Sequence, residues 1–148
     1  MTTASKYPLN GINYDIKVLL AWGESITGNM KITEWLTKNG FPELGLFYYA
    51  LRNEERSRNW LLENKFPHLL ALISGIEGDE KALNWLTKHG FHLLHKMALI
   101  GDGDEAAFEE LAKNDLKIFA LLAKKMELVK DEIEANKKDF HKFNASPF

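Results

Sequence analysis

A Trp-Leu pair recurs at a fixed spacing along most of this chain. The copies are Trp35-Leu36, Trp60-Leu61 and Trp85-Leu86, and Glu110-Leu111 falls where a fourth pair is due. Self-similarity at a fixed period between 20 and 50 residues is the signature of repeat architectures, in which each copy is one supersecondary unit. The chain is therefore predicted to consist of about four 25-residue repeats.

Signals for helix ends divide each repeat into two short helices. Each repeat opens where a helix stop precedes a capping residue, at Gly28-Asn29, Asn53-Glu54, Gly78-Asp79 and Gly103-Asp104. A second stop, where Gly or Asn can adopt the left-handed conformation that ends a helix, follows at Asn39-Gly40, Asn64-Lys65, His89-Gly90 and Asn114-Asp115. Helix pairs are expected near residues 29–52, 54–77, 79–101 and 104–126.

The second helix of each pair carries an apolar face that also repeats. Its members are spaced by 3, 4 and 7 positions: Leu44, Phe47, Tyr48, Leu51; Leu69, Leu72, Ile73, Ile76; Leu94, Met97, Ala98, Gly101; Phe119, Leu122, Ala123, Met126. One helix pair is too small to bury such a face, so neighbouring repeats must cover it. The predicted fold is all-α, an α-solenoid of stacked antiparallel helix pairs.

The ends of the chain depart from the repeat. Residues 1–14 are predicted to be an irregular lead-in, because Pro8, Asn10 and Gly11 favour turns. Asp15 then caps a helix that matches the second helix of a pair, so the stack begins with half a repeat. Repeats occupy residues 15–126, and residues 127–148 are expected to form a capping helix and a tail that frays unless its Phe rings dock. The whole chain, residues 1–148, is expected to form a single domain.

The Trp column has two interpretations. Because each Trp stands beside a Leu on an apolar stripe, we predict a buried ladder between repeats, in which Trp85→Ala costs about 3–5 kcal/mol. The alternative is an exposed platform on which bases or a peptide stack.

The residues Gly78 to Gly90 resemble the second helix of an ankyrin repeat, with its opening Gly, paired apolar site and closing Gly. Ser74-Gly75 match two small residues of that family's first helix, and Pro67-His68-Leu69-Leu70 resembles a degraded form of its Thr-Pro-Leu-His motif. The repeat unit here is shorter than that of the family, whose projecting β-hairpin would be missing between Gly90 and Phe91. The resemblance implies a stacked-helix binding module without catalytic residues or cofactors.

Composition excludes several classes of protein. The net charge of −2 gives no general attraction to nucleic acid or to an anionic membrane. No cysteine is present, which excludes disulfides and a Cys nucleophile and is compatible with the cytoplasm. The longest apolar run near the N-terminus, Val18 to Trp22, is too short for a signal peptide or a membrane span.

Two polar clusters resemble ligand sites but have better structural explanations. His92 and His95 share a helix face near His89 and would suit a metal, but His89 aligns with Asn39, Asn64 and Asn114 of the other repeats. Asp102, Asp104 and Glu105 lack the rest of a calcium loop, so helix capping is the better explanation. No catalytic, cofactor or metal residue is predicted.

All three Arg residues lie close to two Tyr residues, in the set Tyr48, Tyr49, Arg52, Arg56 and Arg58. Arg and Tyr are enriched at interface hot spots, so we predict that this cluster binds an acidic segment of a partner protein. The alternative is a solvated turn neutralised by Glu54 and Glu55. The predicted function is a non-catalytic module for protein–protein interaction; an α-solenoid that binds nucleic acid or another anion is the alternative.

Overall fold

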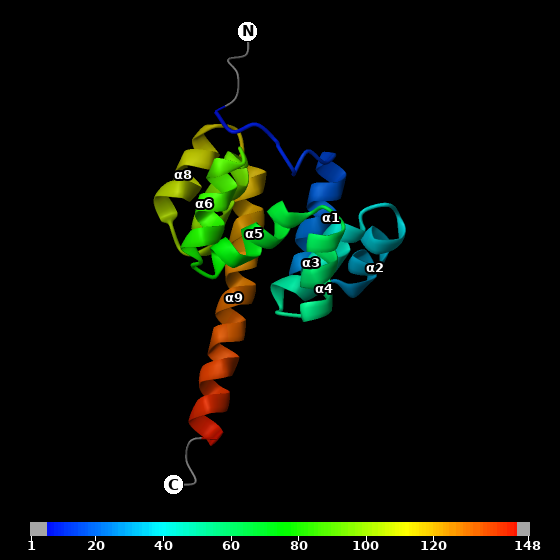
Figure 1. Cartoon of the computed structure of the whole chain (residues 1–148), viewed down its shortest axis with the longest axis vertical. Helices are drawn as coiled ribbons and strands as arrows, with labels where there is room; N and C mark the ends of the chain where they lie inside the picture. The colour runs from blue at the N-terminus through cyan, green and yellow to red at the C-terminus, as the bar shows by residue number, and fades with distance from the viewer. Residues whose placement is uncertain (1–5, 145–148) are drawn as a thin grey trace.

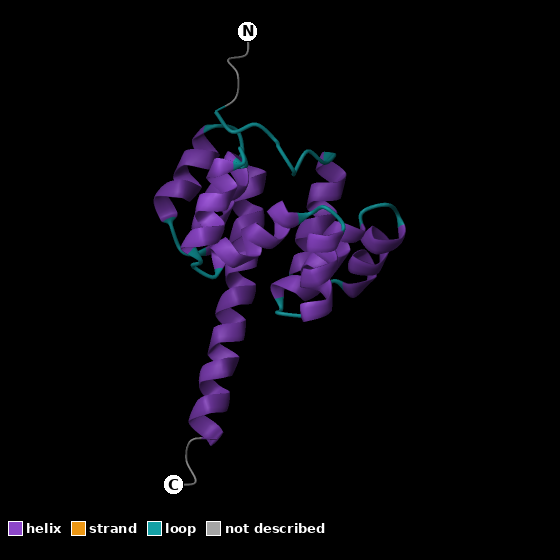
Figure 2. Ribbon diagram, viewed as in Figure 1, coloured by secondary structure: helices purple, strands orange, loops and turns teal. Residues whose placement is uncertain are grey.

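The computed structural model describes the backbone of residues 6–144 and the side chains of residues 6–137. Within that part the chain is all helical and has no strand (Figure 2). The helices are α1 (Ile16–Ile26), α2 (Met30–Lys38), α3 (Pro42–Leu51), α4 (Glu55–Glu63), α5 (Pro67–Ile76), α6 (Glu80–Lys88), α7 (His92–Gly101), α8 (Glu105–Lys113) and α9 (Lys117–Asn144). The predicted all-α class and its helix pairs are confirmed.

The helix boundaries keep the period of the sequence. The first helices of the pairs begin at residues 30, 55, 80 and 105, and the second helices at 42, 67, 92 and 117. We call α2, α4, α6 and α8 the outer helices, and α1, α3, α5, α7 and α9 the inner helices. Helix α1 ends at Ile26, one full period before the end of α3 at Leu51, so it has the register of an inner helix whose outer helix is missing.

The period of the repeat is also seen in the backbone conformation of the turns. Left-handed φ angles occur at two positions per repeat, namely Gly28, Asn53, Gly78 and Gly103 after the inner helices, and Gly40, Lys65, Gly90 and Asp115 after the outer ones. The prediction that Asn64 or Asn114 would adopt this conformation is wrong. These Asn residues close the helix by their side chains instead, since Asn64 Nδ2 donates to Trp60 O and Asn114 Nδ2 donates to Glu110 O.

Lys65 gives a direct test of this turn geometry. Its φ of +70° is a conformation that a residue with a Cβ adopts at a cost of about 1–2 kcal/mol and that Gly adopts freely. Lys65→Gly is expected to raise the free energy of unfolding by about 1 kcal/mol in urea titration. Lys65→Ala, which removes the long side chain but keeps the Cβ, is the control and should give no such gain.

Inner helices pack side by side in chain order, α1 on α3, α3 on α5, α5 on α7 and α7 on α9. Helix α9 also packs against α1, so the last inner helix returns to the first. Each outer helix contacts the inner helices that precede and follow it in the chain. The predicted apolar face of the inner helices is buried throughout, except that Tyr48 is half-buried.

The prediction that the Trp column forms a buried ladder is wrong. The buried residue of each outer helix is the Leu that follows, at Leu36, Leu61, Leu86 and Leu111. Adjacent residues of a helix point about 100° apart, and the narrow buried stripe of these outer helices includes the Leu but not the Trp. Trp35 is 46% exposed, while Trp60 and Trp85 are half-buried. Each Trp stacks on the Phe at the start of the next inner helix, Phe41, Phe66 or Phe91.

Helix α9 continues where the other inner helices stop. The sequence predicted a separate capping helix from residue 127, whereas one helix runs from Lys117 to Asn144 and projects from the rest (Figure 1). Leu128 occupies the position at which earlier repeats place a left-handed Gly or Asn, and Leu strongly favours the helix. The Phe140 and Phe143 side chains, and all of Phe148, lie outside the described residues.

The described part of the lead-in, residues 6–14, is irregular as predicted and packs against the repeats. Tyr7 and Ile12 are buried, and Asn10 Nδ2 donates to Gly90 O at 3.1 Å. Tyr14 Oη donates to the buried carboxylate of Glu43 at 2.7 Å. Burial, together with this bond and the charge of Glu43, raises the pKa of the Tyr14 phenol.

Candidate functional site

Arg52 and Tyr48 of the predicted partner site form one contact within the protein. The guanidinium of Arg52 lies 3.7 Å from the centroid of the Tyr48 ring, a cation–π contact. It also donates to two backbone carbonyls, Tyr48 O at 3.0 Å and Ile26 O at 2.9 Å. Burial lowers the pKa of Arg52, and the charge of Glu132 opposes this. The donors of this Arg are therefore engaged in holding α3 to the end of α1.

Arg58 is engaged in the same way. Its Nε donates to Ala50 O at 2.8 Å, near the end of α3, and its Nη2 pairs with Glu77 at 2.9 Å. Glu77 is the C-cap of α5, so Arg58 links the ends of two inner helices. The neutralising partner expected from the sequence was Glu54 or Glu55. Glu54 accepts from Ser57 Oγ instead.

These contacts belong to a pattern at the C-terminal ends of the inner helices. A cation donates to a carbonyl in the last turn of α1 (Arg52), α3 (Arg58) and α5 (Lys130, to Ile76 O). Helix C-termini leave carbonyls unpaired and carry partial negative charge, which a cation offsets. Two of the three Arg residues of the predicted cluster, Arg52 and Arg58, therefore stabilise the ends of inner helices.

The remaining two members of the cluster are Arg56 and Tyr49. Arg56 is exposed, in the first turn of α4. Tyr49 is half-buried, makes an edge contact with the Tyr48 ring at 4.9 Å, and lines a shallow groove with residues of α2. No contact joins Arg56 to the two Tyr rings among the interactions of the described residues.

If both side chains served only to bind a partner, removal of Arg52 or of Arg56 would leave stability nearly unchanged. The structure separates them. Arg52→Ala is expected to lower the free energy of unfolding by about 1.5–3 kcal/mol, because two carbonyls lose a charged donor. Arg56→Ala, the matched control, should change it by less than about 0.5 kcal/mol. Equal effects in denaturant titration would contradict the assignment of Arg52 as a helix-end cap.

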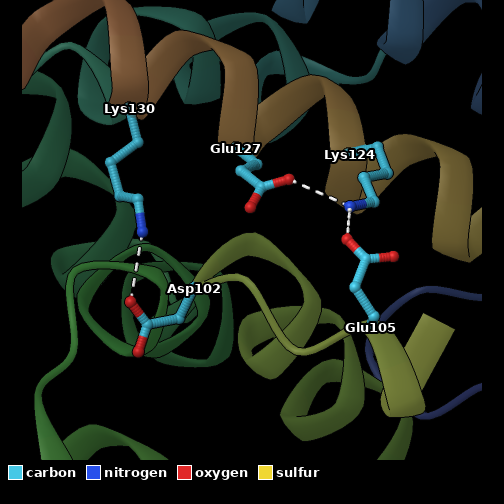
Figure 3. A network of polar contacts seen from close by, with 5 residues as sticks. All are labelled: Asp102, Glu105, Lys124, Glu127 and Lys130. Atoms are coloured by element: carbon cyan, nitrogen blue, oxygen red, sulfur yellow. Dashed lines mark hydrogen bonds and ion pairs between the residues drawn. The ribbon is translucent and has the colours of Figure 1, made fainter. Parts of the chain in front are cut away.

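The acidic cluster at the α7–α8 turn contributes to helix capping and to ion pairs. Asp104 caps α8 by accepting from Ala107 N, as predicted. Asp102 and Glu105 pair with lysines of α9, Lys130 at 3.1 Å and Lys124 at 2.5 Å (Figure 3). Glu127 also contacts Lys124. Asp102 and Glu105 therefore hold α9 against the α7–α8 turn, whereas Glu127 lies on α9 itself.

His89, His92 and His95, which the sequence analysis considered as metal ligands, do not converge. His89 Nδ1 contacts Trp85 O at 2.8 Å, the bond that Asn makes in the other repeats, and its ring stacks on Trp85. His92 is exposed, and burial lowers the pKa of His95. In the described residues no three His, Asp or Glu side chains are grouped to hold a metal ion.

The sequence interpretation missed His68, whose ring stacks on Phe91 at a centroid distance of 5.0 Å. Burial lowers the pKa of this histidine. The position of His68 in α5 did not predict this environment. The ring lies against Gly11, and these two residues are far apart in the chain.

The sequence interpretation also missed an apolar groove between α1 and α9. It has a volume of about 200 Å³ and is lined by Leu19, Leu20, Gly23 and Glu24 of α1 and by Ile118, Leu121, Leu122 and Lys125 of α9. Leu20 is 59% exposed and Leu121 46% exposed. Ile16 and Leu128 continue the same helix faces and are also exposed. Such a concentration of exposed large apolar side chains is typical of interaction sites.

Comparison with known proteins identifies no relative. No family model matches the chain, and neither the curated proteins nor the solved structures contain a significant match. The resemblance to ankyrin repeats thus receives no support from these comparisons. Across the residues that the structure describes, no helix has the length and apolar character needed to cross a membrane.

Proposed function

We propose that the chain is a non-catalytic helical-repeat module that binds another protein. Its four helix pairs would stack as an α-solenoid whose first and last inner helices meet. The observation that supports binding is the apolar groove between α1 and α9, because Leu20 and Leu121 expose large apolar side chains in it. Ile16 and Leu128 are also exposed on the same two helices. An apolar groove between two helices is a common docking site for a protein segment.

The cluster predicted from the sequence contributes less to this proposal than expected. The exposed Arg56 and the half-buried Tyr49 remain candidates for contact with an acidic segment of the partner. Arg52 donates through both terminal nitrogens, and Arg58 through all three guanidinium nitrogens, to backbone carbonyls or to Glu77. A carboxylate or a phosphate would have to share or displace these bonds. This also weakens the nucleic-acid alternative, for which the Arg residues were the main support.

Affinity capture from a native cell extract tests the proposed function. The immobilised chain is expected to retain specific proteins after nuclease treatment, and retention should fall only modestly between about 50 and 200 mM salt. A nucleic-acid binder that neutralises several phosphates would lose affinity steeply over that range. Retention of nucleic acid, or capture that nuclease abolishes, would contradict the proposal in favour of the alternative.

A further inference from the structure

The groove between α1 and α9 occupies a position that an outer helix covers elsewhere in the fold. Outer helix α2 lies over α1 and α3, α4 over α3 and α5, α6 over α5 and α7, and α8 over α7 and α9. Inner helices α9 and α1 also contact each other, more extensively than α9 contacts α3 or α5, and no outer helix within the described part of the chain lies over this pair. The groove lies at this uncovered junction.

Contacts across this junction resemble those between consecutive inner helices. A Cβ built on Gly23 of α1 would lie 3.5 Å from the side chain of Lys125 on α9. In the repeat register, Gly23 corresponds to Ala98 of α7, and Lys125 corresponds to Gly75 of α5. A Cβ on Gly75 would lie 2.9 Å from Ala98, so the two junctions use corresponding positions. The α9–α1 junction therefore shares one pair of contact positions with the more extensive α5–α7 junction.

The two walls of the groove are the faces that touch outer helices in the other repeats. Leu20 of α1 corresponds to Gly45 of α3, which packs directly on Thr33 and Thr37 of α2. Leu121 of α9 corresponds to Ala71 of α5, which lines a groove with α6. Gly45 is buried and Ala71 half-buried under their outer helices, whereas both Leu residues are exposed. The exposed residues mark a vacant outer-helix position.

The part of the chain that the repeat register assigns to this position is used elsewhere. An outer helix before α1 would occupy positions 5–13, one full period before α2. Residues 6–14 are not helical; Asn10 is bonded to Gly90, and Gly11 lies against His68. These anchors keep the lead-in at the turns of other repeats. The vacancy thus exists because this segment leaves its register position.

We propose that the vacant position binds an amphipathic α-helix of a partner protein that carries an aromatic residue followed by Leu. This inference rests on the proposed function. Ile16 corresponds to Phe41, Phe66 and Phe91, each of which receives the Trp of the preceding outer helix. Ile16 has no such cover and is 53% exposed. The aromatic ring of the partner packs on Ile16, and its Leu enters the groove as Leu36, Leu61 and Leu86 enter theirs.

The register also sets the direction and length of the bound helix. Outer and inner helices of a pair are joined by short connections, residues 39–41 in the first pair, and such connections make neighbours antiparallel. The partner helix accordingly runs antiparallel to α1 and spans about nine residues, like each outer helix. Glu24 and Lys125, which face each other at 3.9 Å, offer both signs of charge to its polar side.

A second copy of this chain fits the vacancy less well. Its outer helices are already packed, and its projecting helical segment is the end of α9. Over residues 131–137, where side chains are described, the only large apolar residue is Ile133, and it packs against its own core. Residues 131–137 of α9 therefore offer no apolar stripe for the groove. The occupant is therefore assigned to a different protein.

A peptide with the sequence of an outer helix provides the probe. Residues 79–89 contain Trp85-Leu86, and short isolated helices are marginal in water. The fluorescein-labelled peptide therefore carries Asn84→Lys, joined to Glu80 by a side-chain lactam on its exposed face. Fluorescence anisotropy is expected to show saturable binding to the full chain. The same peptide with Leu86→Asp is the matched control and should bind at least tenfold more weakly.

Variants of the full chain locate the binding site. Leu20→Glu and Leu121→Glu should each weaken the peptide at least tenfold. Leu62→Glu, at a Leu of similar exposure on α4, should leave binding unchanged, because Leu62 lies outside the groove. All three positions are exposed, so circular dichroism should show folded variants. Absence of saturable binding up to about 1 mM peptide, or equal binding by the Leu20→Glu variant, would overturn the inference.

Two further measurements separate this inference from the proposed function. Sedimentation of the unmodified chain is expected to show a monomer; a dimer that Leu121→Glu dissociates would make a second copy the occupant and overturn the inference. If the double variant Leu20→Glu, Leu121→Glu still captures protein from extract, the inference that the groove is the binding site is overturned. The proposed protein binding would then stand. Absence of specific protein capture by the unmodified chain would remove the proposed function itself.

Discussion

Trp22→Ala is expected to lower the free energy of unfolding by about 3–5 kcal/mol, the range for emptying a large aromatic site in a core. Trp22 is fully buried and makes an edge contact with the ring of Phe47 at 5.1 Å. In the repeat register it corresponds to Phe47, Leu72, Met97 and Leu122, which are all buried in the core. Removal of the indole leaves a cavity that these well-packed neighbours cannot close.

Two control substitutions sharpen this prediction in denaturant titration. Trp35→Ala should cost less than about 1 kcal/mol, since Trp35 is 46% exposed. Trp22→Phe should cost much less than Trp22→Ala, because Trp22 Nε1 finds no hydrogen-bond partner in the described part of the chain and Phe removes that buried donor. If Trp35→Ala lowered the free energy of unfolding as much as Trp22→Ala does, the Trp column would belong to the core after all.

Gly45→Ala is expected to destabilise the fold by about 2–3 kcal/mol, the upper range for overpacking. A Cβ on Gly45 would lie 2.0 Å from Thr37 Oγ1 and 2.9 Å from the backbone oxygen of Thr33. Helices α2 and α3 must therefore separate to admit one methyl group. This loss opposes the usual preference for Ala over Gly inside a helix, about 1 kcal/mol in favour of Ala.

The cause of that loss can be isolated by two variants. Adding Thr37→Ala to Gly45→Ala removes the nearest atom and should recover part of the stability, while the clash with the Thr33 backbone remains. Gly40→Ala meets no atom within 4 Å and should cost only about 1 kcal/mol for its left-handed φ of +96°. A gain in stability for Gly45→Ala would show that α2 and α3 are not in close contact there.

Local features of the sequence predicted most of the helical architecture. The turn residues recur at the period of the repeat, and the helix boundaries follow them with the same spacing. The inner faces follow from helical periodicity, which depends only on residues three and four apart. His89 shows how far alignment of the repeats extends, because it makes the same contact to a carbonyl as the Asn residues it replaces.

The predicted site was less accessible to such reasoning. The sequence indicated that Tyr48, Arg52 and Arg58 belong to one cluster. In the structure Arg52 contacts the Tyr48 ring, and Arg58 donates to Ala50 O near the end of α3. Their acceptors, Ile26 O and Glu77, belong to neighbouring repeats, and periodicity does not report which side chain reaches across. The sequence pattern showed that these residues are unusual, but only the tertiary contacts show that the Arg residues stabilise helix ends.

The sequence by itself determined the repeat, its all-helical character and the inner face of each helix, because these depend on turn residues and spacings within a few positions. Only the tertiary structure decided that α9 returns to α1 and that the lead-in leaves the repeat register. These two outcomes depend on packing between residues as far apart as Gly23 and Lys125 or Asn10 and Gly90. The groove is left uncovered as a result, because no outer helix of the described part of the chain lies over α1 and α9. A pattern of residues within a few positions cannot predict this.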